Sequence, residues 1–531
     1  MSETIEKFFK YDETAEKEEY KLNRAIDELI EKYLKKLDIS AQASYENLAS
    51  EFECSEMTEN NNMDDYIQFL DSVLIPNSMN VASPNYMGHM TSSLPYIFRP
   101  LSKLLVALNQ NVVKVETSKV FTLLERQCLA IVHKAIYGYS EQFYLKYIQN
   151  NQSALGIFTS GGSGANLTGL WAARNSVLGP LKNSKGCVYD GLTVTLQDYG
   201  YKRAVVVGSS AAHYSIAKAV DILGLGQNNY IKVPLDNLGR MDCQELINII
   251  HRLKEEKSCI IAVVAIAGST ETGVIDPLEQ IGYICKNEKL FYHIDAAWGG
   301  PILFSEKHRN KLKGIELADS VAMDGHKQFY LPLGIGFCFF SDPLKANFIK
   351  KTANYIIRED SDDLGKYSLD GSRQAICLYL HAALYLFGIK GYGCLIDDRI
   401  CFSRHVADII LGYQEFELIY EPYTNIILYR YILQKYRGLS KEELCENNIT
   451  LVLNHVNDCI QEKQLAKGKF FVSRTRINYG FKDKKNSNIS VLRMVICNPR
   501  ITDENVYLLL EDQIIIGKEI EAEVEKEKEK C

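Results

Sequence analysis

The chain has 531 residues, of which 46% are hydrophobic and 24% charged, and its formal net charge is −7. This length exceeds what one compact core supports, so we expect two or three domains. The acidic balance argues against nucleic acid as a partner, and no apolar run reaches the roughly 18 residues of a membrane span.

Residues 1–80 are predicted to be helical, because Leu22, Ile26, Leu29 and Tyr33 recur at helical spacing. The first residues are acidic and lack an apolar signal core, so we expect a cytoplasmic protein. The 14 cysteines are scattered without a C-x-x-C pair. That pattern argues against a metal site or a disulfide framework.

The next segment, Pro84–Pro95, is predicted to be a loop because it contains two prolines and a glycine. It carries His89. From composition alone, a histidine in such a loop is most often an ordinary surface residue.

A glycine-rich turn, Ser160–Asn166, lies between a predicted strand (Leu155–Thr159) and a predicted helix (Leu167–Arg174). Such a turn offers free backbone N–H groups and the positive end of a helix dipole, so it suits a phosphate group. Many glycine-rich turns are only turns. The strand–turn–helix context favours the phosphate site.

Two further buried strands are predicted at Arg203–Ser209 and Ile260–Ala267. The first leads to His213, which either caps the following helix or serves a site. The second ends in the turn Gly268–Gly273. The repeated order of strand, turn and helix predicts an α/β fold with a mostly parallel sheet, whose ligand lies at the carboxyl ends of the strands.

The strand Phe291–Ile294 ends at Asp295, and the strand Ser320–Met323 leads to His326 and Lys327. Either charged residue alone is weak evidence for catalysis. Together, an acid and a lysine at two strand ends suit a pyridoxal phosphate enzyme. The lysine forms a Schiff base with the cofactor, and the acid keeps the pyridinium nitrogen protonated so that the ring acts as an electron sink.

The motifs HIDAAWGG and DSVAMDGHK resemble those of the group II pyridoxal-phosphate-dependent amino acid decarboxylases, and the resemblance extends from about Pro84 to Pro499. It implies a fold type I enzyme that forms a homodimer, with an N-terminal segment wrapping around the partner subunit. We expect an N-terminal helical segment, a large cofactor domain, a smaller C-terminal α+β domain and a charged tail, at residues 1–110, 111–380, 381–517 and 518–531.

The resemblance also implies roles for individual residues. Lys327, His213 and Asp295 are expected to be catalytic, with His213 stacking on the cofactor ring and contacting the substrate carboxylate. Ser269 matches a contact to the cofactor's phenolic oxygen, and His89 a residue of the substrate pocket. Asp324 departs from the asparagine of some relatives and receives no role. The expected cofactor contacts are Gly162, Ser163 and Ser320 for the phosphate, with Ser269, Ala297 and His326, besides the three catalytic residues.

The polar segment Arg358–Ser372 is predicted to be a mobile loop. Relatives use a loop here to close the site, often with a tyrosine that protonates the carbanion left after CO2 departs. Asp362 stands where one alignment puts that tyrosine, and Tyr355 and Tyr367 flank it without a clean match. The residue that donates this proton is therefore not assigned. Abortive transamination, which loss of the donor tends to favour, remains an alternative reaction.

The segment SVLRMVICNPR, residues 490–500, is predicted to be a strand with Arg493 outward. It matches the family's RMVISNP motif. That match makes Arg493 the candidate that anchors a substrate carboxylate through a bidentate pair.

We therefore expect a decarboxylase that uses pyridoxal 5′-phosphate, needs no metal and acts on an acidic L-amino acid. Residues 83–127 resemble a bacterial branch of aspartate or glutamate decarboxylases. L-Aspartate to β-alanine is accordingly the first choice, and L-glutamate to 4-aminobutyrate the second. Another pyridoxal-phosphate-dependent lyase reaction and a non-catalytic homologue remain as alternatives.

Overall fold

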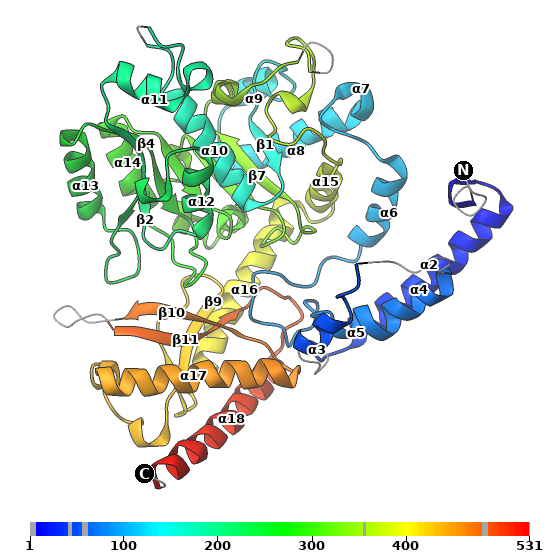
Figure 1. The fold of residues 1–531 in the computed structure, drawn as a ribbon, viewed down its shortest axis with the longest axis vertical. Coiled ribbons are helices and arrows are strands. Elements are labelled where there is room, and N and C mark those ends of the chain that lie inside the picture. Colours follow the sequence, from blue (N-terminus) through cyan, green and yellow to red (C-terminus); the bar gives the residue numbers. More distant parts are fainter. Residues whose placement is uncertain are drawn as a thin grey trace.

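The N-terminal region of the chain is helical, as predicted. The computed structural model describes residues 7–40, 45–55, 62–181, 183–353, 357–479 and 487–529. The first helices form an arm that projects from the rest of the molecule (Figure 1). Asp12 begins the longest of them by accepting hydrogen bonds from the backbone N–H groups of Thr14 and Ala15. The arm contains α2 (Glu13–Lys35), α3 (Tyr45–Ser50), α4 (Met63–Phe69) and α5 (Ile75–Asn77).

A seven-stranded sheet forms the centre of the body, in the order β1-β7-β6-β5-β4-β2-β3. Only β7 runs antiparallel to its neighbours among these described strands, so the mostly parallel sheet that the sequence predicts is confirmed. The short connection of residues 325–335 between β6 and β7 explains the exception, because a parallel pair needs a longer crossover. The strands are β1 (Gly156–Thr159), β2 (Arg203–Ser209), β3 (Tyr230–Val233), β4 (Ser258–Ile266), β5 (Tyr292–Asp295), β6 (Ser320–Asp324) and β7 (Gly336–Phe340).

Helices cover both faces of this sheet (Figure 1). Along β2, Val205 and Val207 pack in one hydrophobic cluster, whereas Ala204 and Val206 pack in another on the opposite face. Both faces of the sheet are therefore buried, as is usual for parallel sheets. The helices of the body are α6 (Phe98–Leu108), α7 (Val115–Ser118), α8 (Val120–Tyr137), α9 (Glu141–Tyr147), α10 (Gly162–Val177), α11 (Cys187–Tyr199), α12 (Tyr214–Ile222), α13 (Cys243–Glu255), α14 (Leu278–Glu288), α15 (Cys377–Leu386) and α16 (Gly388–Leu411).

The C-terminal part of the chain forms a smaller antiparallel sheet in the order β10-β11-β9-β8. The last helix continues unbroken through residue 517, so the charged residues predicted as a tail extend this helix. The domain boundaries themselves stay predictions. The elements are β8 (Phe416–Leu418), β9 (Ile426–Tyr431), α17 (Asn447–Lys467), β10 (Ser473–Tyr479), β11 (Ser487–Val495) and α18 (Asp503–Glu529). No helix among the described residues has the length and apolar character needed to cross a membrane.

The segment Arg358–Ser372, predicted to be a mobile loop, is anchored to the body. Asp363 accepts a hydrogen bond of 2.7 Å from the backbone N–H of Val115. Lys366 is 1% exposed, and its amine donates to the carbonyl oxygen of Asn151 at 3.4 Å. These buried contacts give the segment a defined position in place of the free loop that its polar composition predicts.

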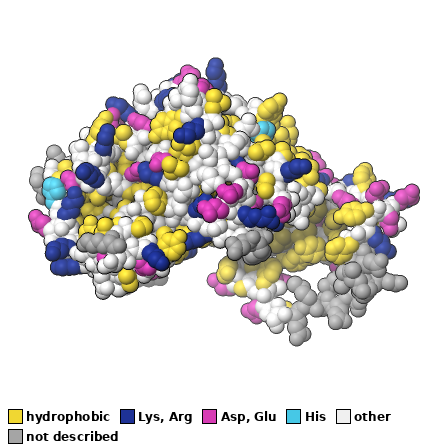
Figure 2. Space-filling model, turned by 90° about the horizontal axis from the view of Figure 1, so that it is seen from above, with side chains coloured by type: hydrophobic (Ala, Val, Ile, Leu, Met, Phe, Trp, Pro, Cys, Tyr) yellow, Lys and Arg dark blue, Asp and Glu magenta, His cyan; other side chains and the backbone are white. Residues whose placement is uncertain are grey.

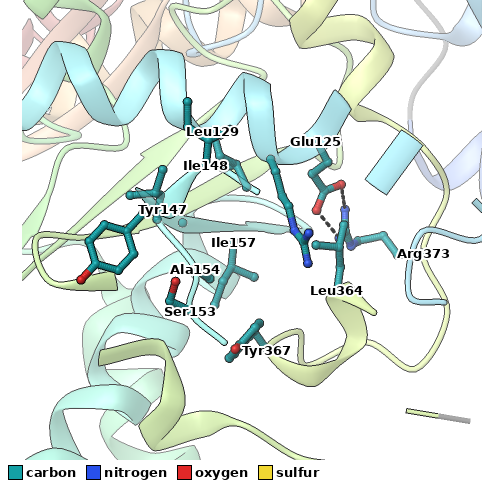
Figure 3. Close-up of a pocket in the computed structure, with 13 residues that line it drawn as sticks. Glu125, Leu129, Tyr147, Ile148, Ser153, Ala154, Ile157, Leu364, Tyr367 and Arg373 are labelled. Carbon is teal, nitrogen blue, oxygen red and sulfur yellow. Dashed lines mark hydrogen bonds and ion pairs between the residues drawn. The ribbon is translucent and has the colours of Figure 1, made fainter. Parts of the chain in front are cut away.

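A buried ion pair lies where this segment meets α8 (Figure 3). Arg373 donates from Nη1 and Nη2 to the two carboxylate oxygens of Glu125, at 2.7 and 2.6 Å. The side chains of Arg373 and Glu125 are 7% and 2% exposed. A buried pair of this kind strongly penalises the loss of one partner, because the other charge stays behind without compensation.

Glu125→Ala is therefore expected to lower the free energy of unfolding by about 3–5 kcal/mol. The exposed pair of Arg203 and Glu256 supplies the control, and Glu256→Ala is expected to cost less than about 1 kcal/mol. Urea denaturation of the three purified proteins measures both effects. Equal midpoints for the two variants would show that the buried pair does not stabilise the fold.

Candidate active site

A cavity of about 310 Å³ opens at the carboxyl ends of the strands in the large sheet. The turns that follow β1, β2, β4, β5 and β6 all contribute to its wall, because parallel strands end at the same edge of a sheet. The structure brings together most of the residues predicted for the cofactor. Those lining the cavity are Gly162, Ser163, His213, Asp295, Ala297, His326 and Lys327.

The glycine-rich turn after β1 presents the N-terminus of α10 to this cavity. The first N–H groups of a helix have no partner within the helix, and the helix dipole favours an anion there. A side chain at Gly162 would crowd this turn, since a Cβ would lie 2.9 Å from Asp324 Oδ2 and 3.2 Å from the Cβ of Ala297. Ser163 is exposed beside it. The turn has the form of a phosphate-binding site.

Asp324, which received no role from the sequence, also belongs to this site. Its Oδ2 accepts a hydrogen bond of 3.0 Å from the backbone N–H of Gly162. Its other oxygen lies 2.6 Å from His326 Nδ1, and Lys327 Nζ lies 3.9 Å from Oδ2. An acid thus stands between the glycine-rich turn and two basic side chains.

Asp295 is a buried carboxylate at the end of β5, with 6% of its surface exposed. Its Oδ1 accepts from the backbone N–H of Ala297 at 3.1 Å, and its Oδ2 accepts from the amide of Asn166 at 2.9 Å. These two donors fix the orientation of the carboxylate. A carboxylate has lone pairs beyond those two, so Asp295 can still accept from a protonated ring nitrogen in the cavity.

His213 is both a helix cap and a wall of the cavity, which unites the two interpretations of the sequence. It precedes α12, and its Nδ1 accepts from the backbone N–H of Ser215 at 3.3 Å. That bond puts the imidazole proton of the neutral ring on Nε2. Burial lowers the pKa of His213, although the charge of Asp295 opposes the shift. The ring is therefore neutral at neutral pH and offers a flat face for stacking.

Two predicted cofactor contacts lie outside the cavity lining. Ser320 is the first residue of β6, at the opposite end of the strand from Lys327, and its hydroxyl lies 2.7 Å from His293 Nδ1. Ser269 is 4% exposed, and its hydroxyl bonds to that of Thr272 at 2.6 Å within its own turn. Both hydroxyl groups form bonds within the protein, and the two expected cofactor contacts stay predictions.

The predicted substrate residues lie beside the cavity, at the junction with the C-terminal sheet. Arg493 was expected to point outward, but it is 5% exposed. Its Nη1 donates to the carbonyl oxygen of Gly88 at 3.0 Å and to Ser473 Oγ at 3.1 Å. His89, the neighbour of Gly88, is exposed, with its ring 5.3 Å from that of Phe471. Although His89 reaches solvent, the loss of water around part of its ring, followed by the charge of Arg493, lowers the pKa of His89.

Two candidate proton donors of the segment 355–372, Asp362 and Tyr367, do not line this cavity. Tyr367 is 4% exposed beside the small cavity of Figure 3, and burial raises its pKa to about 12. Asp362 forms an ion pair of 3.0 Å with Arg126 on α8. Tyr355 lies outside the described residues. The proton donor therefore stays open.

Besides Asp324, two further functional candidates were missed by the sequence reasoning. Asn166 donates to Asp295, and His293 lies 2.9 Å from Asn166 on the other side. The alternation of side chains along a strand was an available signal, since it puts His293 on the same face of β5 as Asp295.

The donor set of the cavity fits pyridoxal 5′-phosphate. It combines a helix N-terminus for a phosphate, a buried carboxylate for a ring nitrogen, an imidazole for stacking and the amine of Lys327 for an aldehyde. The described residues contain no cluster of three or more histidine, cysteine or acidic side chains placed to hold a metal ion.

Comparisons with known proteins agree with this geometry. Residues 46–432 match the family model described as the pyridoxal-dependent decarboxylase conserved domain. The chain is 36% identical over 502 residues to an aspartate 1-decarboxylase of Aliivibrio fischeri, which covers 94% of this chain and 91% of that protein. It is 30% identical over 368 residues to the L-aspartate decarboxylase dtxS4 of Metarhizium robertsii, covering 68% of each. The crystal structure of mouse CSAD has a TM-score of 0.80 at 22% identity, over 94% of this chain and 99% of that chain. This structural likeness confirms the predicted fold.

Proposed function

The chain belongs to the pyridoxal-dependent decarboxylase family, and we propose that it removes CO2 from an acidic L-amino acid, with L-aspartate as the substrate and β-alanine as the product. Pyridoxal 5′-phosphate is the cofactor, and it supplies the sink for the electrons left when CO2 departs. In this proposal Lys327 holds the cofactor covalently, and the turn of Gly162 and Ser163 holds its phosphate, although the N–H of Gly162 bonds to Asp324 Oδ2 in this structure. Asp295 keeps the ring nitrogen protonated, and His213 packs on the ring.

The observation that supports an acidic substrate is the hydrogen bonding of the Arg493 guanidinium. Both bonds to the described residues use Nη1, whereas Nε and Nη2 are buried without a hydrogen-bond partner there. Nε and Nη2 form one edge of the guanidinium, with two parallel N–H groups that match a carboxylate. Burial lowers the pKa of Arg493 to about 10, so the group stays charged at neutral pH. A buried charge with a bare edge is costly unless an anion binds there.

The position of Arg493 relates this edge to the cofactor site. Side chains alternate along β11, so Arg493 shares a face of the sheet with Val491 and Val495. Those two valines pack in one cluster with Trp298, and Trp298 lines the cavity. An amino acid that reacts beside Lys327 would thus have its distal carboxylate near this face.

L-Aspartate is the proposed substrate because two relatives named aspartate decarboxylases match the chain at 36% and 30% identity. L-Glutamate to 4-aminobutyrate is the second candidate, since one more methylene keeps the same charge. A direct test is CO2 release by the cofactor-loaded protein from aspartate, glutamate, cysteine sulfinate and aromatic amino acids. Turnover confined to aspartate supports the proposal, and preference for an aromatic substrate overturns it. No release from any of them would point to another lyase reaction or a non-catalytic homologue.

Arg493→Ala is expected to raise the KM for the acidic substrate by about 10- to 100-fold, because a hydrogen-bonded charge pair is lost. Arg493→Lys keeps the charge without the parallel N–H groups, so we expect an intermediate KM. Arg476→Ala on the neighbouring β10 serves as the control, because Arg476 has an exposed side chain. Steady-state kinetics measure all three variants. An equal rise in KM for an aromatic substrate would argue against the carboxylate contact.

We also propose that the protein is a homodimer. The arm of α2–α5 projects from the body (Figure 1), and Figure 2 shows hydrophobic side chains gathered beside the hollow between the arm and the body. Helix α6 exposes Leu104, Val106 and Leu108. A second copy of the chain would cover such apolar surface. Sedimentation velocity tests this, and a mass of one chain at micromolar concentration would contradict it.

A cytoplasmic location is the last part of the proposal. Cys128, Cys285 and Cys338 are buried free thiols, which suit a reducing compartment. Fractionation of cells that produce the protein would test the location, and recovery from outside the cytoplasm would overturn it.

A further inference from the structure

A chain of buried hydrogen bonds leads from Asp295 away from the cavity into the interior. Asn166 Nδ2 on α10 donates to Asp295 Oδ2 at 2.9 Å, and Asn166 Oδ1 lies 2.9 Å from His293 Nε2. His293 Nδ1 lies 2.7 Å from Ser320 Oγ at the start of β6. Asn166 is 1% exposed, and His293 and Ser320 are fully buried. The chain therefore joins a helix and two strands behind the carboxylate.

The chemistry of these groups gives every bond in the chain a direction. A carboxylate only accepts hydrogen bonds, so the amide NH2 of Asn166 must face Asp295 and its oxygen must face His293. His293 Nε2 is therefore a donor. Burial lowers the pKa of His293 to about 4, so the ring is neutral at physiological pH and its Nδ1 is an acceptor. The hydroxyl of Ser320 must then donate to Nδ1. All the donors point toward Asp295.

The backbone is shaped to allow this arrangement. His293 and Asp295 are two residues apart on β5, so their side chains share a face of the sheet. Gly169 lies one turn after Asn166 on α10, and a Cβ at this position would lie 2.6 Å from the ring of His293. The absence of a side chain at Gly169 lets the helix approach the strand closely enough for the amide to bridge His293 and Asp295.

A purely structural role explains the chain poorly. Apolar side chains at these positions would avoid the cost of burying polar groups. What the polar chain adds is orientation, because the bond from His293 prevents the amide of Asn166 from turning its oxygen toward the carboxylate. The donors from Asn166 and Ala297 then hold the plane of Asp295 while leaving it able to accept from the cavity.

We propose that Asn166, held by His293 and Ser320, is a positioning residue that fixes the orientation of Asp295 and thereby strengthens its pairing with the ring nitrogen of the cofactor. This inference rests on the proposed role of Asp295. It adds Asn166 and His293 to the site and gives Ser320 a role behind the carboxylate, and of these three only Asn166 lines the cavity.

A binding cycle tests the inference without measuring activity. The apoprotein and its variants are titrated with pyridoxal 5′-phosphate and with the 1-deaza analogue, in which C–H replaces the ring nitrogen. His293→Leu is expected to raise the Kd of the natural cofactor by about 10-fold or more, because it removes the hydrogen bond that orients Asn166 toward the charged Asp295. The Kd of the analogue should change by less than about threefold, because its ring has no nitrogen to pair with Asp295.

His293→Gln is the matched control, because the glutamine amide can replace the donor at Nε2. Its two Kd values should stay within about threefold of those of the unmodified protein. Thermal unfolding of each variant reports whether it is folded. Equal weakening of both cofactors by His293→Leu would show a packing effect only and would overturn the inference, as would no weakening of either.

If His293→Leu does not fold, Ser320→Ala replaces it as the test variant. It removes only the hydroxyl that donates to His293, the donor farthest from Asp295. We expect the same selectivity for the natural cofactor with a smaller change, and equal or absent effects on the two cofactors would overturn the inference. Asp295→Asn separates this inference from the proposal beneath it. If Asp295→Asn weakens both cofactors equally, the proposed role of Asp295 fails. If Asp295→Asn is selective and the His293 and Ser320 variants are not, only the positioning role fails.

Discussion

Lys327→Ala is expected to abolish decarboxylation and to remove the visible absorbance of a cofactor joined to the protein through an amine. No other lysine is among the described residues that line the cavity, and the side chain of Lys327 is 15% exposed. Loss of the covalent attachment is expected to reduce kcat on the order of 10⁴-fold or more. Reduction with borohydride followed by peptide mass spectrometry measures the attachment directly, since it makes the bond to the lysine permanent.

Two variants make this result specific to the amine. Lys327→Arg keeps a positive charge but cannot form the bond, so it should match Lys327→Ala in activity and absorbance. Lys313→Ala removes a lysine that is 67% exposed in an ion pair with Glu279, and it should retain both properties. A visible band that persists in Lys327→Ala, with the reduced cofactor found on another lysine, would remove Lys327 from its proposed role.

Asp295→Asn is expected to leave the fold intact and to reduce kcat by about 10²- to 10³-fold. The substitution keeps the shape of the side chain and replaces its charge. Without that charge, nothing at this position favours the proton on the ring nitrogen, so the cofactor loses strength as an electron sink. Single-turnover CO2 release measures the effect, with thermal unfolding as the check on folding.

The variant Asp295→Glu provides the comparison that isolates charge from position. It keeps the carboxylate but moves it by one methylene, so we expect turnover between those of Asp295→Asn and the unmodified protein. Near-normal turnover in a folded Asp295→Asn protein would show that this carboxylate does not pair with the ring nitrogen.

Local patterns in the sequence were sufficient for the residues that sit at strand ends. Asp295 and Lys327 each follow a short apolar strand, and Gly162 opens a helix after another. Because these strands are parallel, their ends meet at one edge, so the cavity could be predicted before any contact was known. The mostly parallel sheet followed from the same alternation of strands and helices.

Residues whose role depends on a distant partner were predicted less well. The side chain of Arg493 was expected to face outward, but the loop at Gly88 and the strand at Ser473 enclose it. The bond between the hydroxyl of Ser320 and His293, a residue on a neighbouring strand, was not foreseen, and the phosphate contact of Ser320 stays a prediction. Polar composition suggested a free loop at Arg358–Ser372, where contacts such as that of Asp363 with Val115 anchor the backbone.

The sequence by itself determined the order of the strands along the chain, the residues at their ends and hence the chemistry of the cofactor site, because periodicity and turn residues are local properties. The tertiary structure alone decided which donors surround Asp295 and which edge of Arg493 is left bare. Those features arise where α10 packs on β5 and where β11 meets the loop at Gly88, between segments about 130 to 400 residues apart. Contacts of that range depend on how whole elements pack, and no local pattern encodes them.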